Sequence, residues 1–320
     1  MIEFFLHGGT LALAWFLLVN LAMSAAVVAG AGWIIRRWTG ADSAAIWFAA
    51  RVLPAATALL FVGVVFVPSY WKYEPRDVVE GFDITLTALA LGAAALLTTA
   101  IVRGVGAWRG AVRRTRVWMQ SARPIAIAGT GIAVYEIDVD TPLMALVGVL
   151  RPRLLVTRGL VAALTDEELA ASIAHEVGHS RARDNLTRLL MRATPDLLTG
   201  TPAARAIERR WASAAEHRAD RMAADDSPVA RCALASALVK VARLTPAMTP
   251  LAEPISTLID GGEIASRVER LLADATPSAR SRAAFAWTAL ALGAAVTVVV
   301  YAPALRFVHS ATELLVHSLP

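Results

Sequence analysis

This 320-residue sequence has little cysteine and, for its length, little charge. Cys232 is the only cysteine, which excludes an intrachain disulfide and any metal site built from several thiolates. Charged residues make up 18% of the chain and hydrophobic residues 57%, whereas soluble domains carry about 25% charged residues. The shortage of charge therefore argues against an ordinary soluble protein and favours a chain that lies partly in a membrane.

Four apolar segments are long enough to cross a bilayer, which takes about 20 mostly apolar residues. They are Leu11–Ile35, Ala44–Val67, Ile84–Val102 and Ala283–Leu305. Only the second holds a charged residue, Arg51, and we expect its long side chain to snorkel toward the interface. Because the first segment lacks a basic leader and a second span follows almost at once, we expect it to be retained as a span.

Basic residues predict how the spans are oriented, because Lys and Arg are enriched in short cytosolic loops. Two arginines follow the first span, and six arginines without an acidic residue lie within 103–123. The 68–83 loop, in contrast, holds two basic and four acidic residues. We therefore predict a multi-pass protein of the cell membrane with an extracytosolic N-terminus, a cytosolic segment at 103–282 and a short extracytosolic tail at 306–320.

A net charge of +5 raises the question of an acidic partner. The arginines gather at the predicted membrane boundaries, where topology and contact with anionic lipid account for them. No nucleic-acid recognition motif accompanies the charge. We therefore expect contact with membrane lipid and no direct binding of nucleic acid.

The segment at 103–282 is long enough for one domain, and its pattern predicts an α+β fold. Short β-prone runs come first, separated by glycines and prolines. These runs are PIAIAG, GIAVYEI, MALVGVL and RLLVT. One helix is predicted over 164–193, where Thr165 and Glu168 have the spacing of a capping box. Further helical patterns lie at 204–224, 230–244 and 263–275.

The stretch SIAHEVGHSRARDN holds two histidines, His175 and His179, one helical turn apart and therefore on one face of a helix. This pattern offers two imidazoles to zinc and keeps a carboxylate, Glu176, beside the water that the metal activates. A buried pair of imidazoles beside a carboxylate would be costly without a cation. We predict one Zn²⁺ per chain, with Glu176 as the general base, although such ligands also suit other divalent metals.

The third ligand is expected on the later helix, in the stretch AAEHRADRMA. We predict Glu216 as the ligand and Asp220, one turn on, as the acceptor of the second N–H of a ligating imidazole. His217 is the competing ligand, but it points about 100° around the helix from Glu216, so both cannot serve. The alternative is an ordinary surface helix in which the two carboxylates pair with nearby arginines. These arginines are Arg209, Arg218 and Arg221.

Two further roles stay open at the level of sequence. Asp184, five residues after His179, either orients the helix that carries the histidines or pairs with a neighbouring arginine. Those neighbours are Arg181 and Arg188. The group that would stabilise the oxyanion has no signature of its own, and the candidates are His217, Arg218 and Arg221.

At this point the chain resembles the membrane gluzincins, which include the HtpX and CaaX-type proteases and the BlaR/MecR transducers. The resemblance rests on the histidine–glutamate helix, on EHRAD, on the preceding GVLRPRLLVTRGLVAALTDEEL and on GGEIASRVERLL. It implies a multi-pass α-helical membrane protein with an inserted cytosolic α+β zinc peptidase domain. It also implies zinc held by His175, His179 and Glu216, with Glu176 as the catalytic base.

The order of segments favours the BlaR/MecR arrangement within that resemblance. HtpX-like enzymes usually place hydrophobic spans between the two zinc motifs, whereas here the interval Ser180–Ala215 contains seven arginines. Three spans at 1–102, a cytosolic domain at 103–282 and a fourth span at 283–305 match the transducers. The penicillin-binding sensor domain of those proteins has no counterpart in the last 15 residues, RFVHSATELLVHSLP.

Three functions are therefore compared. The first is a cytosol-facing zinc endopeptidase that cleaves a regulatory protein, such as a transcriptional repressor, or its own chain. The second is an HtpX-like protease for quality control of membrane proteins, and the third is a non-catalytic signalling scaffold. The aromatic residues of the 68–83 loop fit an interfacial belt, with a role as a sensor as the alternative.

Overall fold

The computed structural model describes residues 1–37, 44–76, 83–127, 130–224, 227–244, 256–257, 264–273 and 303–314. The helices are α1 (Ile2–Arg37), α2 (Ala44–Leu60), α3 (Val67–Tyr73), α4 (Ile84–Met119), α5 (Arg158–Ala163), α6 (Asp166–Ala182), α7 (Asp184–Ala193), α8 (Pro202–Ala224), α9 (Pro228–Leu244) and α10 (Ile264–Leu272). A π-helical segment at Phe61–Phe66 joins α2 to α3, and an unlabelled helix covers 303–314. The strands are β1 (Ala122–Ile125), β2 (Ala133–Ile137), β3 (Met144–Val147), β4 (Arg153–Thr157) and β5 (Ser256–Thr257).

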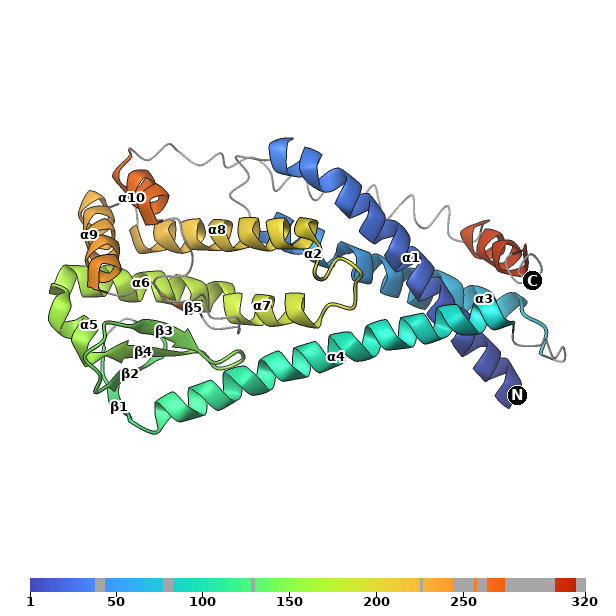
Figure 1. Ribbon diagram of the computed structural model, residues 1–320, viewed down its shortest axis with the longest axis horizontal. Coiled ribbons are helices and arrows are strands. Elements are labelled where there is room, and N and C mark those ends of the chain that lie inside the picture. Colours follow the sequence, from blue (N-terminus) through green and yellow to red (C-terminus); the bar gives the residue numbers. More distant parts are fainter. Residues whose placement is uncertain are drawn as a thin grey trace.

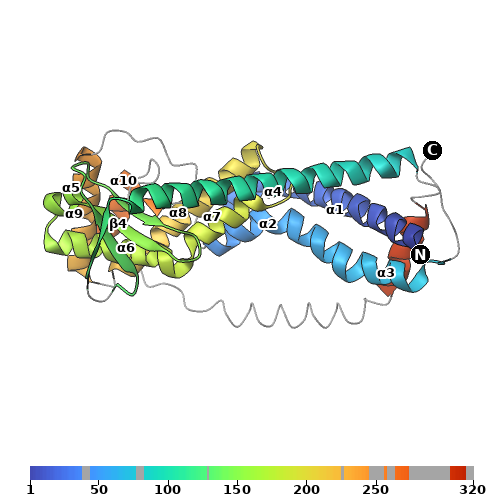
Figure 2. The ribbon, with the colours of Figure 1, turned by 90° about the horizontal axis from the view of Figure 1, so that it is seen from below.

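Three helical stretches are long and apolar enough to cross a membrane: Ile2–Gly30, Ala44–Tyr73 and Ile84–Met119. A helical domain with a small mixed sheet follows them, which is the predicted fold class. α4 runs from the end of the molecule that holds the N-terminus and α3 to the end that holds the sheet (Figures 1 and 2). The fourth predicted span, 283–305, lies outside the described residues except for its last three.

The third span does not end where its apolar stretch does. α4 continues without a break beyond Val102 to Met119, so the third candidate span and the start of the following domain share one helix. α7 packs along this extension, where a Cβ on Gly104 would stand 2.7 Å from the Cβ of Ala193. The close approach of the two helices holds the arginine-rich turns of α4 against the domain.

The sheet has the strand order β1-β2-β4-β3-β5, in which only the β2–β4 pair is parallel. Alternate residues of β4 face opposite sides: Leu154 and Val156 join the core under α6 and α9, while Leu155 joins the core under the end of α4. Three of the four predicted β-prone runs each contain a strand, whereas PIAIAG overlaps β1 only at Pro124 and Ile125. The two-residue strand β5 was not predicted.

The prediction of one helix over 164–193 is wrong in one respect, because the structure has two helices in this range. α6 starts with the predicted capping box, in which Thr165 and Glu168 bond each other's backbone N–H groups. It ends at Arg183, a non-glycine residue in the left-handed region with φ of 56°. The new helix α7 begins at Asp184, whose Oδ2 lies 2.7 Å from Nδ1 of His179.

Helices α6 and α8 lie unusually close. A Cβ on Gly178 would stand 3.2 Å from the Cα and 3.4 Å from the Cβ of Ala219. The absence of a side chain at Gly178 lets the two backbones approach this far without a tight contact. The contact lies one residue from His179 and three residues from Glu216, so it sets the distance between the predicted ligands.

Candidate metal centre

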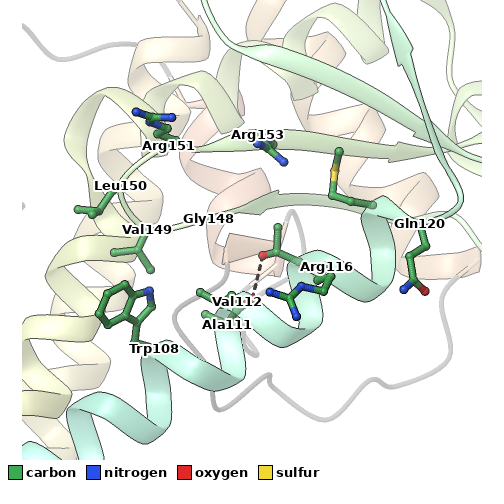
Figure 3. A pocket seen from close by; sticks show the side chains of 12 residues that line it. Trp108, Ala111, Val112, Arg116, Gln120, Gly148, Val149, Leu150, Arg151 and Arg153 are labelled. Atoms are coloured by element: carbon green, nitrogen blue, oxygen red, sulfur yellow. Dashed lines mark hydrogen bonds between the residues drawn. The ribbon is translucent and has the colours of Figure 1, made fainter.

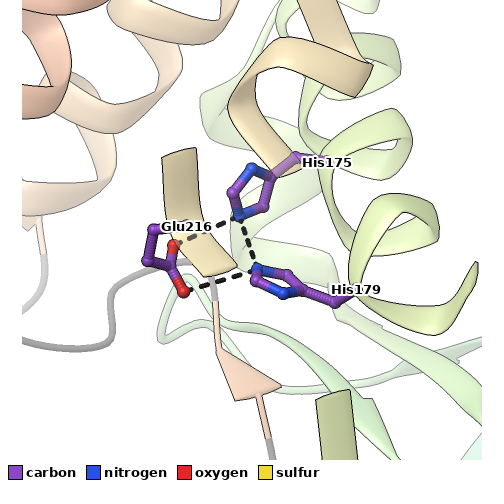
Figure 4. A group of neighbouring side chains, drawn as sticks. All are labelled: His175, His179 and Glu216. Atoms are coloured by element: carbon purple, nitrogen blue, oxygen red, sulfur yellow. Dashed lines mark hydrogen bonds and ion pairs between the residues drawn. The ribbon is translucent and has the colours of Figure 1, made fainter. Parts of the chain in front are cut away.

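Two buried imidazoles and one buried carboxylate converge between α6 and α8 (Figure 4). The Nε2 atoms of His175 and His179 are 3.1 Å apart. Each lies 3.4 Å from an oxygen of Glu216, Oε2 for His175 and Oε1 for His179. The structure thus brings together the three predicted ligands, with one donor atom from each aimed at a common point.

Carboxylates behind the two imidazoles determine which nitrogen faces that point. Nδ1 of His175 lies 2.9 Å from Oδ1 of Asp220, and Nδ1 of His179 lies 2.7 Å from Oδ2 of Asp184. A carboxylate can only accept, so Nδ1 of His179 donates its hydrogen to Asp184 and its Nε2 turns a lone pair inward. Nδ1 of His175 faces Asp220 at ion-pair distance without the angle of a hydrogen bond, and its Nε2 faces the same point as that of His179. Asp184 in turn accepts a hydrogen bond of 2.6 Å from Arg218.

This donor set fits a divalent cation. Two inward lone pairs 3.1 Å apart repel each other unless a proton or a cation lies between them. Imidazoles backed by carboxylates, together with one carboxylate ligand, are a usual environment for zinc and related metals. The ligand role of the three residues stays a prediction, and the geometry meets its requirements.

Glu176 lies beside the group and is completely buried. Neither of its carboxyl oxygens has a hydrogen-bond partner in the part of the chain that the structure describes. Burial raises the pKa of the Glu176 carboxyl, which the imidazole charges of His179 and His175 only partly offset. A carboxyl with a raised pKa and a free acceptor oxygen is suited to take up and return a proton near neutral pH.

The charges within the group are strongly linked. Burial lowers the pKa of His179, but the Glu216 charge and the hydrogen bond to Asp184 outweigh it and raise this pKa to about 10. Burial raises the pKa of Glu216, yet the charges of His179 and Arg267 hold it well below its usual range. The centre is therefore built to hold positive charge beside Glu216.

Arg267 on α10 is the residue that sequence reasoning missed. Its guanidinium is buried and contacts Glu216 Oε2 at 2.9 Å and both oxygens of Asp220, at 2.6 and 3.0 Å. A signal was present in IASRVERLL, because Arg267 falls on the apolar face formed by Ile264, Val268 and Leu271. A cation on a buried face requires a buried carboxylate.

The surface-helix alternative for α8 does not hold, because Glu216 and Asp220 are only 5% and 4% exposed. Of the candidates for the oxyanion stabiliser, Arg218 lies behind His179, where it contacts Asp184. Arg267, whose guanidinium lies beside Glu216, is a further positively charged side chain at the centre.

Two cavities meet at the Gly148–Leu150 turn between β3 and β4. One, of about 340 Å³, reaches His179 and Asp184. The other, of about 680 Å³, lies between this turn and α4 and is mostly apolar, with Trp108 on one side (Figure 3). Arginines at its edge are Arg116, Arg151 and Arg153. The turn therefore separates the metal group from a larger apolar surface.

A helix with two histidines and a glutamate, a second helix with a further carboxylate and three membrane-type helices define a membrane-associated metallopeptidase. The model of peptidase family M48 matches residues 112–286. This match covers more than half of the chain, so the chain belongs to peptidase family M48 and is a hydrolase. No curated protein matches the sequence.

Proposed function

We propose that this chain is a membrane-bound zinc endopeptidase that cleaves proteins on the cytosolic side. The observation that carries the proposal is the inward-facing group of His175, His179 and Glu216 beside the unpartnered carboxyl of Glu176. A protein that used this group only as a structural element would gain nothing from a buried carboxyl without a hydrogen bond, which is costly.

Zinc, when bound, supplies Lewis-acid polarisation of the scissile carbonyl and makes water more acidic. Glu176 accepts a proton from the attacking water and returns it to the leaving amine. Asp220 and Asp184 hold the imidazoles of His175 and His179 in the required tautomer. The hydrogen bond from His179 Nδ1 to Asp184 opposes rotation of this imidazole away from the centre.

Arg267 supports the same geometry from the other side. Its guanidinium bridges Glu216 and Asp220, so a ligand carboxylate and the carboxylate that orients His175 share one cation. A planar guanidinium with several donors suits such a bridge better than an ammonium group would. The bridge ties α10 to α8 at the centre.

The substrate class follows from the predicted orientation and from the cavities. We infer a cytosolic protein substrate, such as a transcriptional repressor, or the chain itself. A polypeptide that crosses the Gly148–Leu150 turn would contact both the cavity at His179 and the apolar one beside α4.

The interval 180–215 forms α7 and the start of α8, and none of the three candidate spans falls in this fully described interval, which supports the BlaR/MecR-like arrangement.

The first test compares the wild type with Glu176→Ala in detergent, using self-cleavage and cleavage of an unfolded model protein. Loss of the general base should lower the rate by about 10²–10⁴-fold while zinc content stays unchanged. Glu167→Ala, an exposed carboxylate on the same helix, is the matched control and should cleave normally. Full activity of Glu176→Ala would rule out the mechanism, and wild-type protein that neither binds zinc nor cleaves would favour a scaffold.

The same preparations separate regulatory cleavage from quality control. A regulatory protease should cut a mixture of peptides at one preferred sequence, because its pocket selects a particular side chain. Cleavage at many unrelated sites in unfolded membrane proteins would favour the quality-control function instead. A chelator should abolish either pattern.

A further inference from the structure

A second group of metal-type side chains lies at the opposite end of the molecule from the peptidase. It is formed by Glu74, directly after α3, and by His309 and Glu313 on the helix at 303–314. One donor atom from each residue lies within 4.8 Å of the other two. His309 and Glu313 are four residues apart, so they project from one face of their helix.

The helix that carries this pair is held in place by specific contacts. The hydroxyl of Ser69 on α3 donates to the Leu305 carbonyl at 2.7 Å, and both groups are buried. The indole N–H of Trp15 on α1 donates to the Thr312 hydroxyl at 3.1 Å. Val308 packs into an apolar cluster with residues of α1, α3 and α4. The position of the pair relative to α3 is therefore defined by contacts on neighbouring helical turns.

The side chains are oriented toward one another. The ring of Tyr73 stacks on the imidazole of His309 at 5.6 Å and 28°. Nδ1 of His309 lies 3.8 Å from Oε2 of Glu74, and the two side chains are only 26% and 10% exposed. Stacking fixes the plane of the imidazole, so that its Nδ1 points at the carboxylate.

The distance from His309 Nδ1 to Glu74 Oε2 is too long for a direct hydrogen bond and is slightly longer than the separation of two ligands on one zinc ion. A separation of 3.8 Å is longer than a hydrogen bond, which ends near 3.2 Å. Two ligands that bind zinc at about 2.0–2.2 Å in a tetrahedral site lie roughly 3.3–3.6 Å from each other.

We propose that Glu74, His309 and Glu313 form a second divalent-cation site, on the other side of the membrane from the metallopeptidase centre. The site lies near the start of α4, whereas the peptidase follows its end (Figures 1 and 2). The 36 residues of α4 extend about 54 Å, longer than the hydrocarbon core of about 30 Å. One imidazole and two carboxylates select zinc or a metal of similar hardness. Its binding ties the helix at 303–314 to α3.

The test is the zinc content of the full-length protein in detergent, stripped with a chelator and dialysed against a low concentration of zinc chloride. We expect two zinc ions per chain for the wild type and one for His309→Phe, which keeps the stacked ring but loses the ligand nitrogen. His175→Ala/His179→Ala should also hold one, and the combination of all three substitutions none. Glu3→Gln, an exposed carboxylate at the same end of the molecule, is the control and should retain two.

Two results would overturn the second site: a zinc content of one in the wild type, or an unchanged content in His309→Phe. Glu313→Gln adds a milder substitution of the same site, and it should weaken the second zinc without affecting the first. Zinc should also raise the melting temperature of the double variant His175→Ala/His179→Ala. Adding His309→Arg to this double variant keeps a positive charge beside Glu74 and should abolish the rise. A plain ion pair would predict no zinc effect in either protein.

Discussion

His179 shows how a single residue links protons, metal and stability. Its pKa rises from an ordinary value of 6.5 to about 10, because the charge of Glu216 and the hydrogen bond to Asp184 outweigh the effect of burial. In metal-free protein a proton on the imidazole therefore supplies the positive charge that the carboxylates require. Zinc must displace this proton, so metal binding and protonation compete at the same nitrogen pair.

This competition predicts opposite pH trends for the two forms of the protein. In metal-free protein the pKa of His179 is higher in the folded state than in the unfolded state. Protonation of His179 therefore contributes stability that is complete below pH 6.5 and is lost as pH rises through about 10. The melting temperature of chelator-treated protein should therefore fall across this window, while zinc affinity should rise. Thermal denaturation in detergent and zinc titration at several pH values measure both. Metal-free protein that became more stable toward pH 10 would contradict the assignment.

At the scale of elements, the contact of α6 with α8 places Glu216 opposite the histidines. Gly178→Val would put three extra carbons where Ala219 already stands 3.2 Å from a Cβ position. Overpacking of this kind costs about 1–3 kcal/mol, and separation of the helices should weaken zinc binding by about tenfold or more. Zinc titration measures the effect. Gly106→Val, at a helical glycine with open space around it, is the control for the loss of glycine itself.

Most elements could be predicted from the sequence because their signals are local. The capping box of Thr165 and Glu168 and the alternation in β4 depend on neighbouring residues alone. The break at Arg183 could not, since no glycine or proline marks it and it depends on the contact of Asp184 with His179. The bridge from Arg267 to Glu216 joins residues about fifty positions apart and leaves no spacing to recognise.

The loop between α7 and α8, residues 194–201, connects the spans to the helices that carry the metal group. Each candidate span donates a side chain to it: Asn20 to the Pro195 carbonyl at 2.7 Å, Arg51 to Asp196, and Arg103 to the Thr194 carbonyl at 2.9 Å. The expectation that Arg51 snorkels to the interface is wrong, because its guanidinium is buried against carboxylates of the domain. A polar group within a span is stable only with such a partner.

The ion pair of Arg51 with Asp196 should behave as a buried pair. Arg51→Met leaves the fully buried Asp196 without this cation and should cost about 3–5 kcal/mol of unfolding free energy. The double variant Arg51→Met/Asp196→Leu replaces the pair by apolar side chains and should recover most of the loss. Denaturation in detergent compares the three proteins. Equal instability of the single and double variants would show that the pair has another structural role.

At the scale of the whole molecule, α4 joins two ends with different chemistry. One end holds the Glu74, His309 and Glu313 group, and the other holds the metallopeptidase centre. The predicted 68–83 loop is wrong in its first part, because α3 and the second candidate span extend to Tyr73. If α4 crosses the membrane, the two ends lie on opposite sides of it. The arginines that follow Val102 then predict that the peptidase faces the cytosol.

The single cysteine makes this orientation directly measurable. Cys232 is exposed on α9, so a membrane-impermeant maleimide should label the wild type only after the cells are lysed. Arg76, exposed just beyond α3, offers the opposite position, and Cys232→Ser/Arg76→Cys should be labelled in intact cells. Cys232→Ser alone is the control and should stay unlabelled in both. Labelling of the wild type in intact cells would place the peptidase outside, and it would then exclude cytosolic proteins as substrates while leaving the chemistry of the metal centre unchanged.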